Sequence, residues 1–380
     1  MKFRCERDVL VEALSTAGRA VTSRNTTLPV LAGVRLELSG DTLRVAGTDL
    51  DLFIQVEVTV AGQEDGTVVV PSRLVTDIVR ALEPGAVRVE ADDDEMRIAS
   101  GRSQFAVRMY QAEDFPKLPV PPQQAVTLPA GALADALRQV VRAASTDEGV
   151  PIITGVLMAA EGGSLRLVAT DKYRLAVRDL PGAGVLGEGQ QVLVPSRALG
   201  ELQRLLTSRA KPADGEQAAG TVTLRLGEHD ATFEQGTTRL TTRLIPGDFP
   251  NYRQLIPSGY PNRLIVGREP LLDALHRVRL LVRDQITSVR MALRPEGITL
   301  TVATADLGTA TEDVDAKYEG TEMTVAFNPA YLSEGVEAIT SDEVLVEALD
   351  PVKQVTLKAN NPTGPDGDYL YLLMPVRVPS

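Results

Sequence analysis

Two predicted helices of this 380-residue chain carry arginines in the same pattern, and these residues are the best suited to chemistry. The helices belong to the strand–helix segments Val68–Leu82 and Val192–Leu206. In each, an arginine, an acid and a second arginine lie at i, i+4 and i+7, on one helical face: Arg73, Asp77 and Arg80, then Arg197, Glu201 and Arg204. Such a face attracts phosphate, which predicts sequence-independent, salt-sensitive binding to a duplex backbone. The alternative is an ordinary solvated face with local salt bridges.

Further arginines lie on another predicted helix. Arg138 and Arg142 are i, i+4 neighbours, and we include both in the phosphate-facing set. A third copy of the strand–helix segment departs from the pattern, because Ala330, Glu334 and Glu337 stand at the positions of arginine, acid and arginine. The basic face is therefore predicted only for the first two copies.

The chain lacks the motifs of common catalytic sites. No GxxxxGKS/T phosphate loop, no GxGxxG after a strand and no GxSxG elbow occurs. Of the two histidines, His229 is predicted in a hairpin turn and His276 on a helix surface. The acidic run Asp92–Glu95 lies between alternating strands, which favours a solvated hairpin turn over a metal loop. We expect no enzyme, no metal and no cofactor.

Composition limits the setting in which the chain works. The formal net charge of −12 argues against a generic nucleic-acid-coating protein but leaves room for a local basic surface. Aromatic residues make up 4 %, with no Trp, so stacking on unpaired bases is disfavoured. The single cysteine, Cys5, cannot form an intramolecular disulfide, and no apolar run is long enough to span a bilayer. We expect a cytoplasmic protein with no membrane partner.

A threefold repeat organises the chain. Similar helical segments begin at Glu6, Leu128 and Gly267, and each precedes a pair of strands joined by a short turn. The turns are Gly40-Asp41, Gly162-Gly163 and Glu296-Gly297. A strand and a second helix follow in every copy. The predicted fold class is α+β, with three repeated domains of two helices packed on antiparallel sheets, at residues 1–121, 122–258 and 259–380.

A polar Thr/Asp turn recurs in the three copies. ATDKYRLAV, at Ala169–Val177, has the pattern of a strand end, a turn and a strand start. GTDLDLFIQV, at Gly47–Val56, and ATADLGTATEDV, at Ala303–Val314, carry similar turns after alternating apolar runs.

These repeats, together with the segments ATDKYRLAV, DFPNYRQLIP and YLLMPVRVPS, resemble the bacterial DNA polymerase III β subunit family, the sliding clamps. The resemblance covers the whole chain in order. It implies a head-to-tail homodimer in which three clamp-type domains per chain form a six-domain ring, with helices lining the hole. Such a ring-shaped processivity factor encircles duplex DNA without sequence specificity and tethers the replicative DNA polymerase. It has no enzymatic activity, and an ATP-driven clamp loader opens it.

The resemblance also implies a partner-peptide pocket between the second and third domains. In the family this pocket binds short linear motifs of polymerases, the clamp loader and repair proteins. An apolar groove with a few polar anchors would suit an extended peptide with Leu and Phe side chains. The pocket residues by this resemblance are Ile153, Thr170, Lys172, Tyr173, Arg174, Leu175, Pro250, Leu255, Asn328, Tyr331, Val352, Met374, Pro375, Val376 and Arg377.

Two other surfaces follow from the resemblance. Arg24 and Arg73 match DNA-facing positions of the family. At the dimer interface, Phe105 and Val107 of one chain are expected to meet Leu280 and Leu281 of the other.

The chain departs from the family at the pocket rim. Many members have Gly-His where this chain has Lys172-Tyr173, and an arginine where it has Gln254. The family's glutamine and tyrosine contacts with DNA do not transfer, because Asp147, Pro151 and Ile152 stand in that segment. The middle Thr/Asp turn is the copy expected to line the pocket, while the other two stay structural.

Three other functions are weighed against the clamp. A specialised clamp paralogue with an altered pocket, for example one resisting an inhibitor, would keep the same fold. A repeat scaffold that binds protein but not DNA would be monomeric at micromolar concentration. A hydrolase with an unrecognised site would need a nucleophile and base, and the sequence shows no such constellation.

Overall fold

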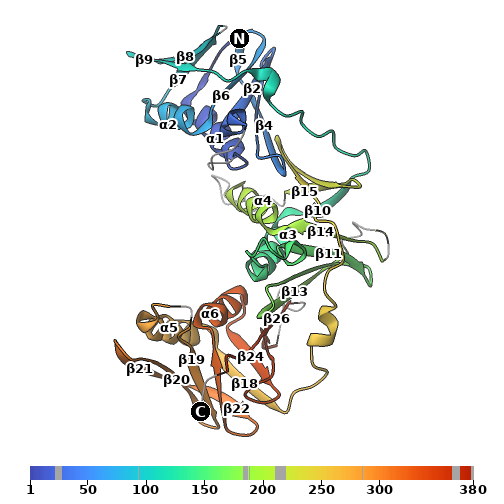
Figure 1. The fold of residues 1–380 in the computed structure, drawn as a ribbon, viewed down its shortest axis with the longest axis vertical. Coiled ribbons are helices and arrows are strands. Elements are labelled where there is room, and N and C mark those ends of the chain that lie inside the picture. Colours follow the sequence, from blue (N-terminus) through green and yellow to red (C-terminus); the bar gives the residue numbers. More distant parts are fainter. Residues whose placement is uncertain are drawn as a thin grey trace. The chain divides into compact units, whose positions relative to one another are not determined.

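The computed structural model describes residues 1–21, 28–92, 94–182, 187, 189–209, 220–284, 286–361 and 369–377 (Figure 1). Arg24, predicted to face DNA, lies outside the described residues. In the part of the chain that is described, no helix is long and apolar enough to cross a membrane.

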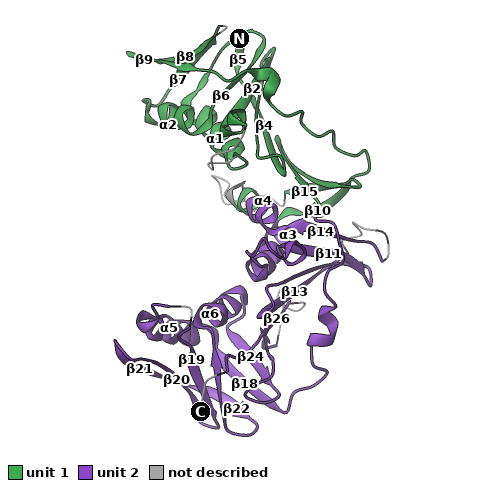
Figure 2. Ribbon diagram, in the orientation of Figure 1, with its two compact units in different colours: residues 1–130, 204–244 green, residues 131–203, 245–380 purple. Residues whose placement is uncertain are grey.

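The chain divides into two compact units (Figure 2). Unit 1 comprises Met1–Ala130 and Arg204–Leu244, and unit 2 comprises Gly131–Gln203 and Ile245–Ser380. Residues of the predicted second domain, 122–258, are thus shared between the two units. The reason is that strands of successive repeats pair edge to edge, so that a sheet continues from one repeat into the next.

Unit 1 holds two antiparallel sheets. One has the order β5-β1-β7-β8-β9, with bounds Ala61–Glu64, Lys2–Glu6, Ala86–Ala91, Glu95–Ser100 and Ser103–Arg108. The other has the order β10-β15-β16-β17-β4-β3-β2-β6, with bounds Val126–Pro129, Thr221–Leu226, Asp230–Gln235, Thr238–Arg243, Leu52–Thr59, Thr42–Thr48, Gly33–Ser39 and Gly66–Pro71. The β17–β4 ladder joins the second repeat to the first.

Unit 2 holds two further sheets. One has the order β14-β11-β12-β13-β26-β25-β24-β18-β22, with bounds Gln191–Pro195, Gly155–Glu161, Ser164–Thr170, Arg174–Pro181, Tyr369–Leu373, Val355–Ala359, Glu343–Ala348, Asn262–Gly267 and Ala316–Glu319. The other has the order β21-β20-β19-β23, with bounds Gly308–Val314, Gly297–Thr304, Val289–Arg294 and Met323–Phe327. The β13–β26 ladder joins the second repeat to the third.

Among the residues that the structure describes, each repeat contains two α-helices, as the sequence predicts. They are α1 Arg7–Gly18, α2 Ser72–Ala81, α3 Ala130–Val140, α4 Ser196–Arg209, α5 Arg268–Val278 and α6 Pro329–Ala338. Short 3-10 turns are η1 Pro29–Ala32, η2 Ala112–Asp114, η3 Val141–Ala143, η4 Pro151–Ile153, η5 Tyr252–Leu255 and η6 Arg279–Leu281. The buried side chains of α1 recur at helical spacing, which explains why one face packs on its sheet: Leu10, Ala13, Leu14 and Ala17.

The predicted hairpins form at the predicted turns. Gly40 joins β2 to β3 with a φ of 56°, and Gly162 joins β11 to β12 with a φ of 59°. Both angles lie in the left-handed region, which glycine adopts without a Cβ clash. The local turn chemistry therefore sets the register of both hairpins.

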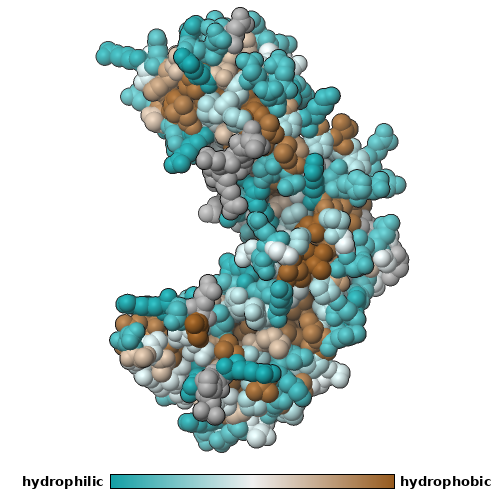
Figure 3. Space-filling view, in the orientation of Figure 1, coloured by the Kyte–Doolittle hydropathy of each residue, from teal (hydrophilic) through white to brown (hydrophobic). Residues whose placement is uncertain are grey.

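The remaining polar candidates lie where the sequence places them. The His229 side chain is 86 % exposed in the β15–β16 turn, and His276 lies on α5. Asp92 and Glu95 close the β7–β8 hairpin, with the Glu95 N–H donating to Asp92 Oδ1 at 3.1 Å. In the described ranges, no group of three or more His, Cys, Asp or Glu side chains could hold a metal ion. On the face seen in Figure 3, hydrophobic residues form small areas among hydrophilic ones.

Candidate functional site

The turn between β12 and β13 is built by the side chains of Thr170 and Asp171. Thr170 Oγ1 donates to the Arg174 carbonyl at 2.7 Å. Asp171 Oδ1 accepts from the backbone N–H groups of Tyr173 and Arg174, each at 3.0 Å. Lys172 has a φ of 81°. An Asp side chain that bonds to the backbone two and three residues on holds a tight turn, so this segment is rigid at the main chain.

Arg174 is buried beneath this turn, with 8 % of its surface exposed. Its Nε lies 2.9 Å from Asp171 Oδ2, and its guanidinium also donates to the Glu334 carboxylate and the Arg142 carbonyl. The guanidinium carbon lies 4.1 Å from the centre of the Tyr331 ring. The predicted pocket residue Arg174 is therefore tied to η3 and α6, and its donors are largely engaged within the chain.

Arg174 keeps its charge, and the nearby phenols of Tyr331 and Tyr371 stay neutral, at neutral pH. Burial alone would lower the pKa of Arg174, but Tyr371 and the Glu334 carboxylate outweigh it and raise that pKa. Burial raises the pKa of Tyr371, and burial followed by the Asp171 carboxylate raises the pKa of Tyr331. The phenols thus stay neutral beside a permanent cation, which suits the hydrogen bond from the Tyr371 hydroxyl to the Tyr331 carbonyl at 3.0 Å.

The end of the chain is docked rather than loose up to residue 377. After β26 pairs with β13, the Met374 N–H donates to the Tyr173 carbonyl at 2.8 Å. The Val376 N–H donates to the Ala326 carbonyl, also at 2.8 Å. The first bond continues the β13–β26 pairing past the last strand residue, and the second ties the segment to β23, so the predicted pocket residues Met374–Arg377 begin beside the β12–β13 turn and continue along β23.

Exposed apolar side chains gather around this docked segment, and we name them the apolar patch. The exposed fractions are 61 % for Tyr173, 45 % for Leu255, 61 % for Val352, 37 % for Met374 and 37 % for Val376. Leu255 and Val352 come from η5 and the β24–β25 loop, which a hydrogen bond from Gln354 Nε2 to the Leu255 carbonyl joins at 2.9 Å. A set of large apolar groups left in water on supported elements is the signature of a docking surface.

Other predicted pocket residues support this surface from below. Ile153, Thr170 and Leu175 are buried, and Leu175 belongs to one core cluster with Tyr252 and Leu372. Asn328 caps α6, since its Oδ1 accepts from the N–H groups of Ala330 and Tyr331 at 2.9 and 3.2 Å. Exposed positions at the rim are Lys172, Pro250 and Arg377, with Tyr331 and Pro375 half-buried.

Sequence reasoning missed the residues that organise the patch. Glu334, Gln354 and Tyr371 each contact a predicted pocket residue or its element, yet none belongs to the predicted set. Glu334 had a signal, because it stands where the first two repeats carry Asp77 and Glu201. Gln354 and Tyr371 carry no local signal, since their partners lie 99 and 40 residues away in the chain.

The arginine face of α2 lies in solvent. The side chains of Arg73, Asp77 and Arg80 are 96 %, 56 % and 57 % exposed. Arg80 Nη1 lies 3.2 Å from Asp77 Oδ1, while Val75 and Val79 are buried on the opposite side. On α4, Arg197 and Arg204 are likewise exposed.

Arg138 and Arg142 lie differently, because both contact α6. Arg138 Nη1 donates to the carbonyls of Glu337 and Ala338, each at 3.4 Å, at the end of that helix. Arg142 Nη1 lies 2.9 Å from Glu337 Oε2. Cations at a helix C-terminus stabilise its unpaired carbonyls, so these two arginines have a packing role that the sequence did not predict.

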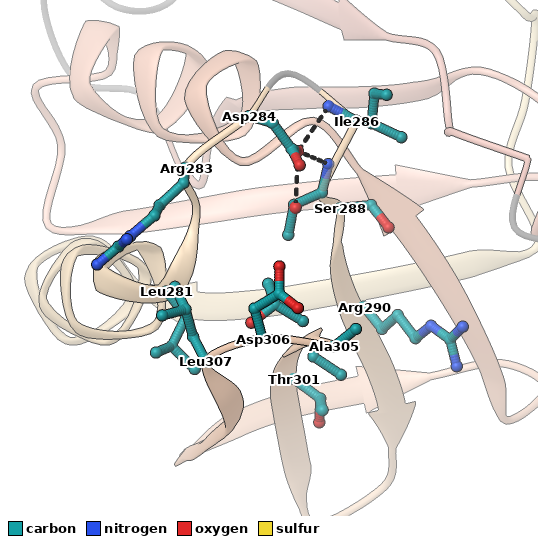
Figure 4. A pocket seen from close by; sticks show the side chains of 13 residues that line it. Leu281, Arg283, Asp284, Ile286, Ser288, Arg290, Thr301, Ala305, Asp306 and Leu307 are labelled. Carbon is teal, nitrogen blue, oxygen red and sulfur yellow. Dashed lines mark hydrogen bonds between the residues drawn. The ribbon is translucent and has the colours of Figure 1, made fainter.

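The predicted dimer residues lie on the edge strand β9 and on the 3-10 turn η6. Phe105 is 40 % exposed on the edge strand β9, where Val107 is buried against its own sheet. Leu280 is 80 % exposed on η6, and Leu281 lines a cavity of about 570 Å³ beside the β20–β21 turn (Figure 4).

Two carboxyl groups contribute to this cavity. Asp284 Oδ1 accepts from the N–H groups of Ile286 and Thr287 at 3.0 and 2.7 Å, and from the Thr287 hydroxyl at 2.8 Å. The hydroxyl bond and then the backbone bonds hold the pKa of Asp284 below its usual value. Figure 4 shows the Asp306 carboxyl group directed toward the middle of the cavity.

Comparison with known proteins identifies one family along the whole chain. The three domains described as the DNA polymerase III beta subunit N-terminal, central and C-terminal domains match residues 1–119, 127–251 and 253–377. The beta sliding clamps of Streptomyces coelicolor and Synechococcus elongatus are each 34 % identical, with 100 % of both chains covered.

Solved structures agree with these sequence matches. The sliding clamp of Bartonella birtlesii bound to griselimycin has a TM-score of 0.90 and 30 % identity, with 100 % of both chains covered. The Bacillus subtilis sliding clamp has a TM-score of 0.88 and 28 % identity, covering 100 % of this chain and 99 % of that one.

Proposed function

This chain belongs to the DNA polymerase III beta subunit family, and we propose the way in which it acts as a DNA sliding clamp. It encircles duplex DNA as a ring and tethers the replicative polymerase. Members of this family are non-catalytic processivity factors, so the chain is not an enzyme. The relatives named above carry the names sliding clamp or beta sliding clamp, which gives no support to a repeat scaffold or a specialised paralogue.

Two unpaired strand edges carry the proposal of a head-to-tail homodimer. Within the chain, the strand after the first hairpin of one repeat pairs with the last strand of the next, in the ladders β4–β17 and β13–β26. In the third repeat β21 holds the position of β4 and β13, and in the first repeat β9 holds that of β17 and β26. Both are edge strands in the described sheets, so β21 of one subunit is free to pair with β9 of another.

The internal ladders also predict the register of this junction. The hairpin pairs Thr170↔Leu175 and Thr304↔Gly308 align β13 with β21. Ala176, one residue after Leu175, pairs with Tyr371 of β26. By the same alignment Thr309, one residue after Gly308, pairs with the residue of β9 that corresponds to Tyr371, which is Phe105 of the partner subunit. Ala176 and Tyr371 are buried at 0 % and 2 %, whereas Phe105 is 40 % exposed, as expected for a junction that only a second chain completes.

A disulfide across the proposed junction tests the ring. The double variant Phe105→Cys/Thr309→Cys should form a covalent dimer under oxidation, because directly opposed strand residues have Cβ atoms about 4.5–5.5 Å apart. A matched control, Phe105→Cys/Thr311→Cys, places the second thiol two residues along β21. A monomeric mass for the unmodified protein at micromolar concentration would overturn the homodimer.

We propose that Arg73, Arg80, Arg197 and Arg204 face duplex DNA, with Arg24, Arg138 and Arg142 as further members of the set. The exposure of the α2 and α4 arginines supports this proposal. The guanidinium groups of Arg138 and Arg142 already contact α6, so a smaller contribution to phosphate binding is expected from each.

The test is the salt dependence of binding to duplex DNA. Arg73→Ala/Arg197→Ala should weaken binding and reduce the slope of log K against log salt by about 1 for each phosphate that the variant no longer binds. Arg88→Ala, an exposed arginine on β7, serves as the matched control. An unchanged slope in the double variant removes both arginines from the DNA surface.

We propose that the apolar patch and its rim bind short linear motifs of the polymerase, the clamp loader and repair proteins. Support comes from exposed apolar side chains held by the docked residues 374–377. Removing Met374–Ser380 should abolish binding of an apolar clamp-motif peptide in calorimetry while leaving the dimer mass unchanged. Peptide affinity equal to that of the full chain would refute the placement.

We further propose the domain boundaries 1–121, 122–258 and 259–380 and a cytoplasmic location without a membrane partner. The family matches end close to these boundaries. A single cysteine, Cys5, supports a reducing compartment, because no intramolecular disulfide can form.

A further inference from the structure

Lys172 stands at the rim of the apolar patch in a conformation that is unfavourable for a residue with a Cβ. Its φ of 81° lies in the left-handed region, and its side chain is exposed. The equivalent residue of the first repeat, Leu50, has a φ of 85° but packs its side chain against a core cluster. The turn built by Thr and Asp therefore sets the backbone in both repeats, and what distinguishes Lys172 is an exposed charged side chain at the rim of the apolar patch.

The carboxylates around the rim are already engaged. Asp171 binds Arg174 and two backbone N–H groups of its own turn, and Glu334 binds the same guanidinium. In the β24–β25 loop, Asp350 accepts from two backbone N–H groups at 2.9 Å and pairs with Lys353 at 3.5 Å. These three carboxylates are therefore not available to neutralise an additional cation.

Two cations at the rim remain available. Among the residues that the structure describes, neither Lys172 nor Arg377 forms an ion pair, and both are exposed. Lys172 directly precedes Tyr173, whose carbonyl accepts from the Met374 N–H, and Arg377 follows Met374 by three residues. Unpaired positive charge thus lies on both of the neighbouring segments that expose the apolar side chains.

We propose that this surface selects apolar peptides that carry carboxylates beside their anchors. Tyr173, Met374 and Val376 contact the apolar anchor, and Lys172 and Arg377 each contact a carboxylate of the peptide. Lys172 is then a specificity-determining residue, and its left-handed backbone conformation directs the ammonium group outward at the rim. This inference rests on the proposed function of the patch as a peptide-binding site.

The overall charge of the chain makes the preference a local one. With a formal net charge of −12, the protein as a whole repels an acidic peptide. Only cations close to the bound peptide can reverse that tendency, since charges beyond about 8–10 Å are screened at physiological salt. Selection for carboxylates therefore depends on Lys172 and Arg377 rather than on the net charge of the protein.

The test compares two peptides on the full-length protein. Both carry the same apolar anchors, one with flanking Asp and Glu and the other with Asn and Gln at the same positions. By titration calorimetry at low salt we expect the acidic peptide to bind about threefold to tenfold tighter, as two exposed ion pairs allow. Lys172→Met should reduce that ratio, and Lys172→Met/Arg377→Met should remove it.

A matched control separates local contact from net charge. Lys317 is another exposed lysine without an ion pair in the described part of unit 2, on β22 at the far edge of the sheet. Lys317→Met changes the net charge equally and should leave the ratio intact. Equal binding of both peptides to the unmodified protein overturns the charge preference while the peptide site stands. If neither peptide binds, the proposed function of the patch itself fails.

Discussion

The β3–β4 and β12–β13 turns share one main-chain design but differ in what their side chains do. In the first, Asp49 Oδ1 accepts from the N–H groups of Asp51 and Leu52 at 3.1 and 2.8 Å, as Asp171 does in the second. The third turn residue is left-handed in both, with φ of 85° at Leu50 and 81° at Lys172. Thr and Asp therefore specify the backbone, whatever the turn is used for.

The side chains decide the role of each turn. Leu50 packs against the cluster of Val30, Leu31, Val69 and Phe115, and Leu52 is buried at 2 %. At the matching positions, Lys172 is exposed and Arg174 is buried in a polar network. The same loop is thus a piece of apolar core in one repeat and the rim of the apolar patch in the other.

The third copy differs from the other two, and its strand β21 lies at the edge of the described sheet. In β20–β21, Thr304 pairs with Gly308, so the turn is one residue shorter than those closed by Thr48↔Phe53 and Thr170↔Leu175. Ala305 follows Thr304 where Asp171 follows Thr170, so Asp306 does not occupy the position of Asp171. Residues Gly308 and Thr309 are exposed, whereas the equivalent Leu175 and Ala176 are buried.

Placing the polar residue of one turn in the other should have the largest effect. Leu52→Arg places a guanidinium at a position where the leucine is 2 % exposed, and Asp49, the counterpart of Asp171, is the only acid of that turn placed to meet it, so we expect destabilisation of about 4 kcal/mol or more. Leu52→Ala, the control for lost volume, should cost about 2–4 kcal/mol. Denaturant unfolding measures both. An arginine tolerated at 52 would mean that the two turns are interchangeable.

Removing the buried cation tests the polar turn directly. Arg174→Met removes the cation that Asp171 and Glu334 share, and we expect a loss of about 3 kcal/mol from unit 2. Because Glu334 is 34 % exposed, solvent should moderate this cost. In the double variant Arg174→Met/Glu334→Met, part of the stability should return. A single variant as stable as the parent would show that the network contributes nothing.

Substitution by glycine at the left-handed position should change the free energy of unfolding in opposite directions in the two turns. Leu50→Gly also relieves left-handed strain, but it removes an apolar side chain from its cluster and adds glycine entropy, so a net destabilisation of unit 1 by about 1 kcal/mol is expected. Lys172→Gly relieves the left-handed strain of about 1–2 kcal/mol and adds glycine entropy of about 0.5–1 kcal/mol, so a net stabilisation of about 0.5 kcal/mol is expected. The midpoints of chemical unfolding compare the two variants with the parent protein. A shift in the same direction for both would contradict the assignment of strain to Lys172.

Alkaline pH should destabilise unit 2 through two of its tyrosines, with the smallest magnitude of these effects. The pKa values of Tyr331 and Tyr371 are raised in the fold, chiefly by burial, so their neutral forms stabilise it. That stability is complete below the unfolded pKa of about 10 and is lost as pH rises through the folded values. At pH 10.5 the loss should be below about 1 kcal/mol for each tyrosine. Tyr371→Phe should show a smaller change between pH 8 and 10.5, and an identical change would disprove its contribution.

Much of the fold was predictable because its signals are local. The helices follow from apolar residues at i, i+3, i+4 and i+7, as in α1, and the hairpins from glycines at Gly40 and Gly162. The exposed arginine face of α2 also follows from spacing alone. Each of these features depends on residues close together in sequence. Because the pattern recurs in successive repeats, each copy supports the interpretation of the others.

The contacts of the candidate site depend on distant residues and escaped prediction. Arg174 meets Glu334 across 160 residues, and Arg138 reaches the Ala338 carbonyl across 200. No spacing rule reports such partners. The sequence alone therefore assigned Arg174 to a peptide-binding wall and Arg138 to a DNA surface, while the structure places both in contacts with α6.

By itself, the sequence determined the threefold repeat, the helices and hairpins of each copy, and the turn that Asp49 and Asp171 build. These depend on backbone preference and periodicity, which act over a few residues. Only the tertiary structure decided that sheets continue between repeats, that residues 374–377 dock beside Tyr173, and that Arg174 is buried while Lys172 is exposed. The reason is physical: burial and ion pairing are settled by whichever distant surface packs against a side chain, and local sequence does not encode that surface.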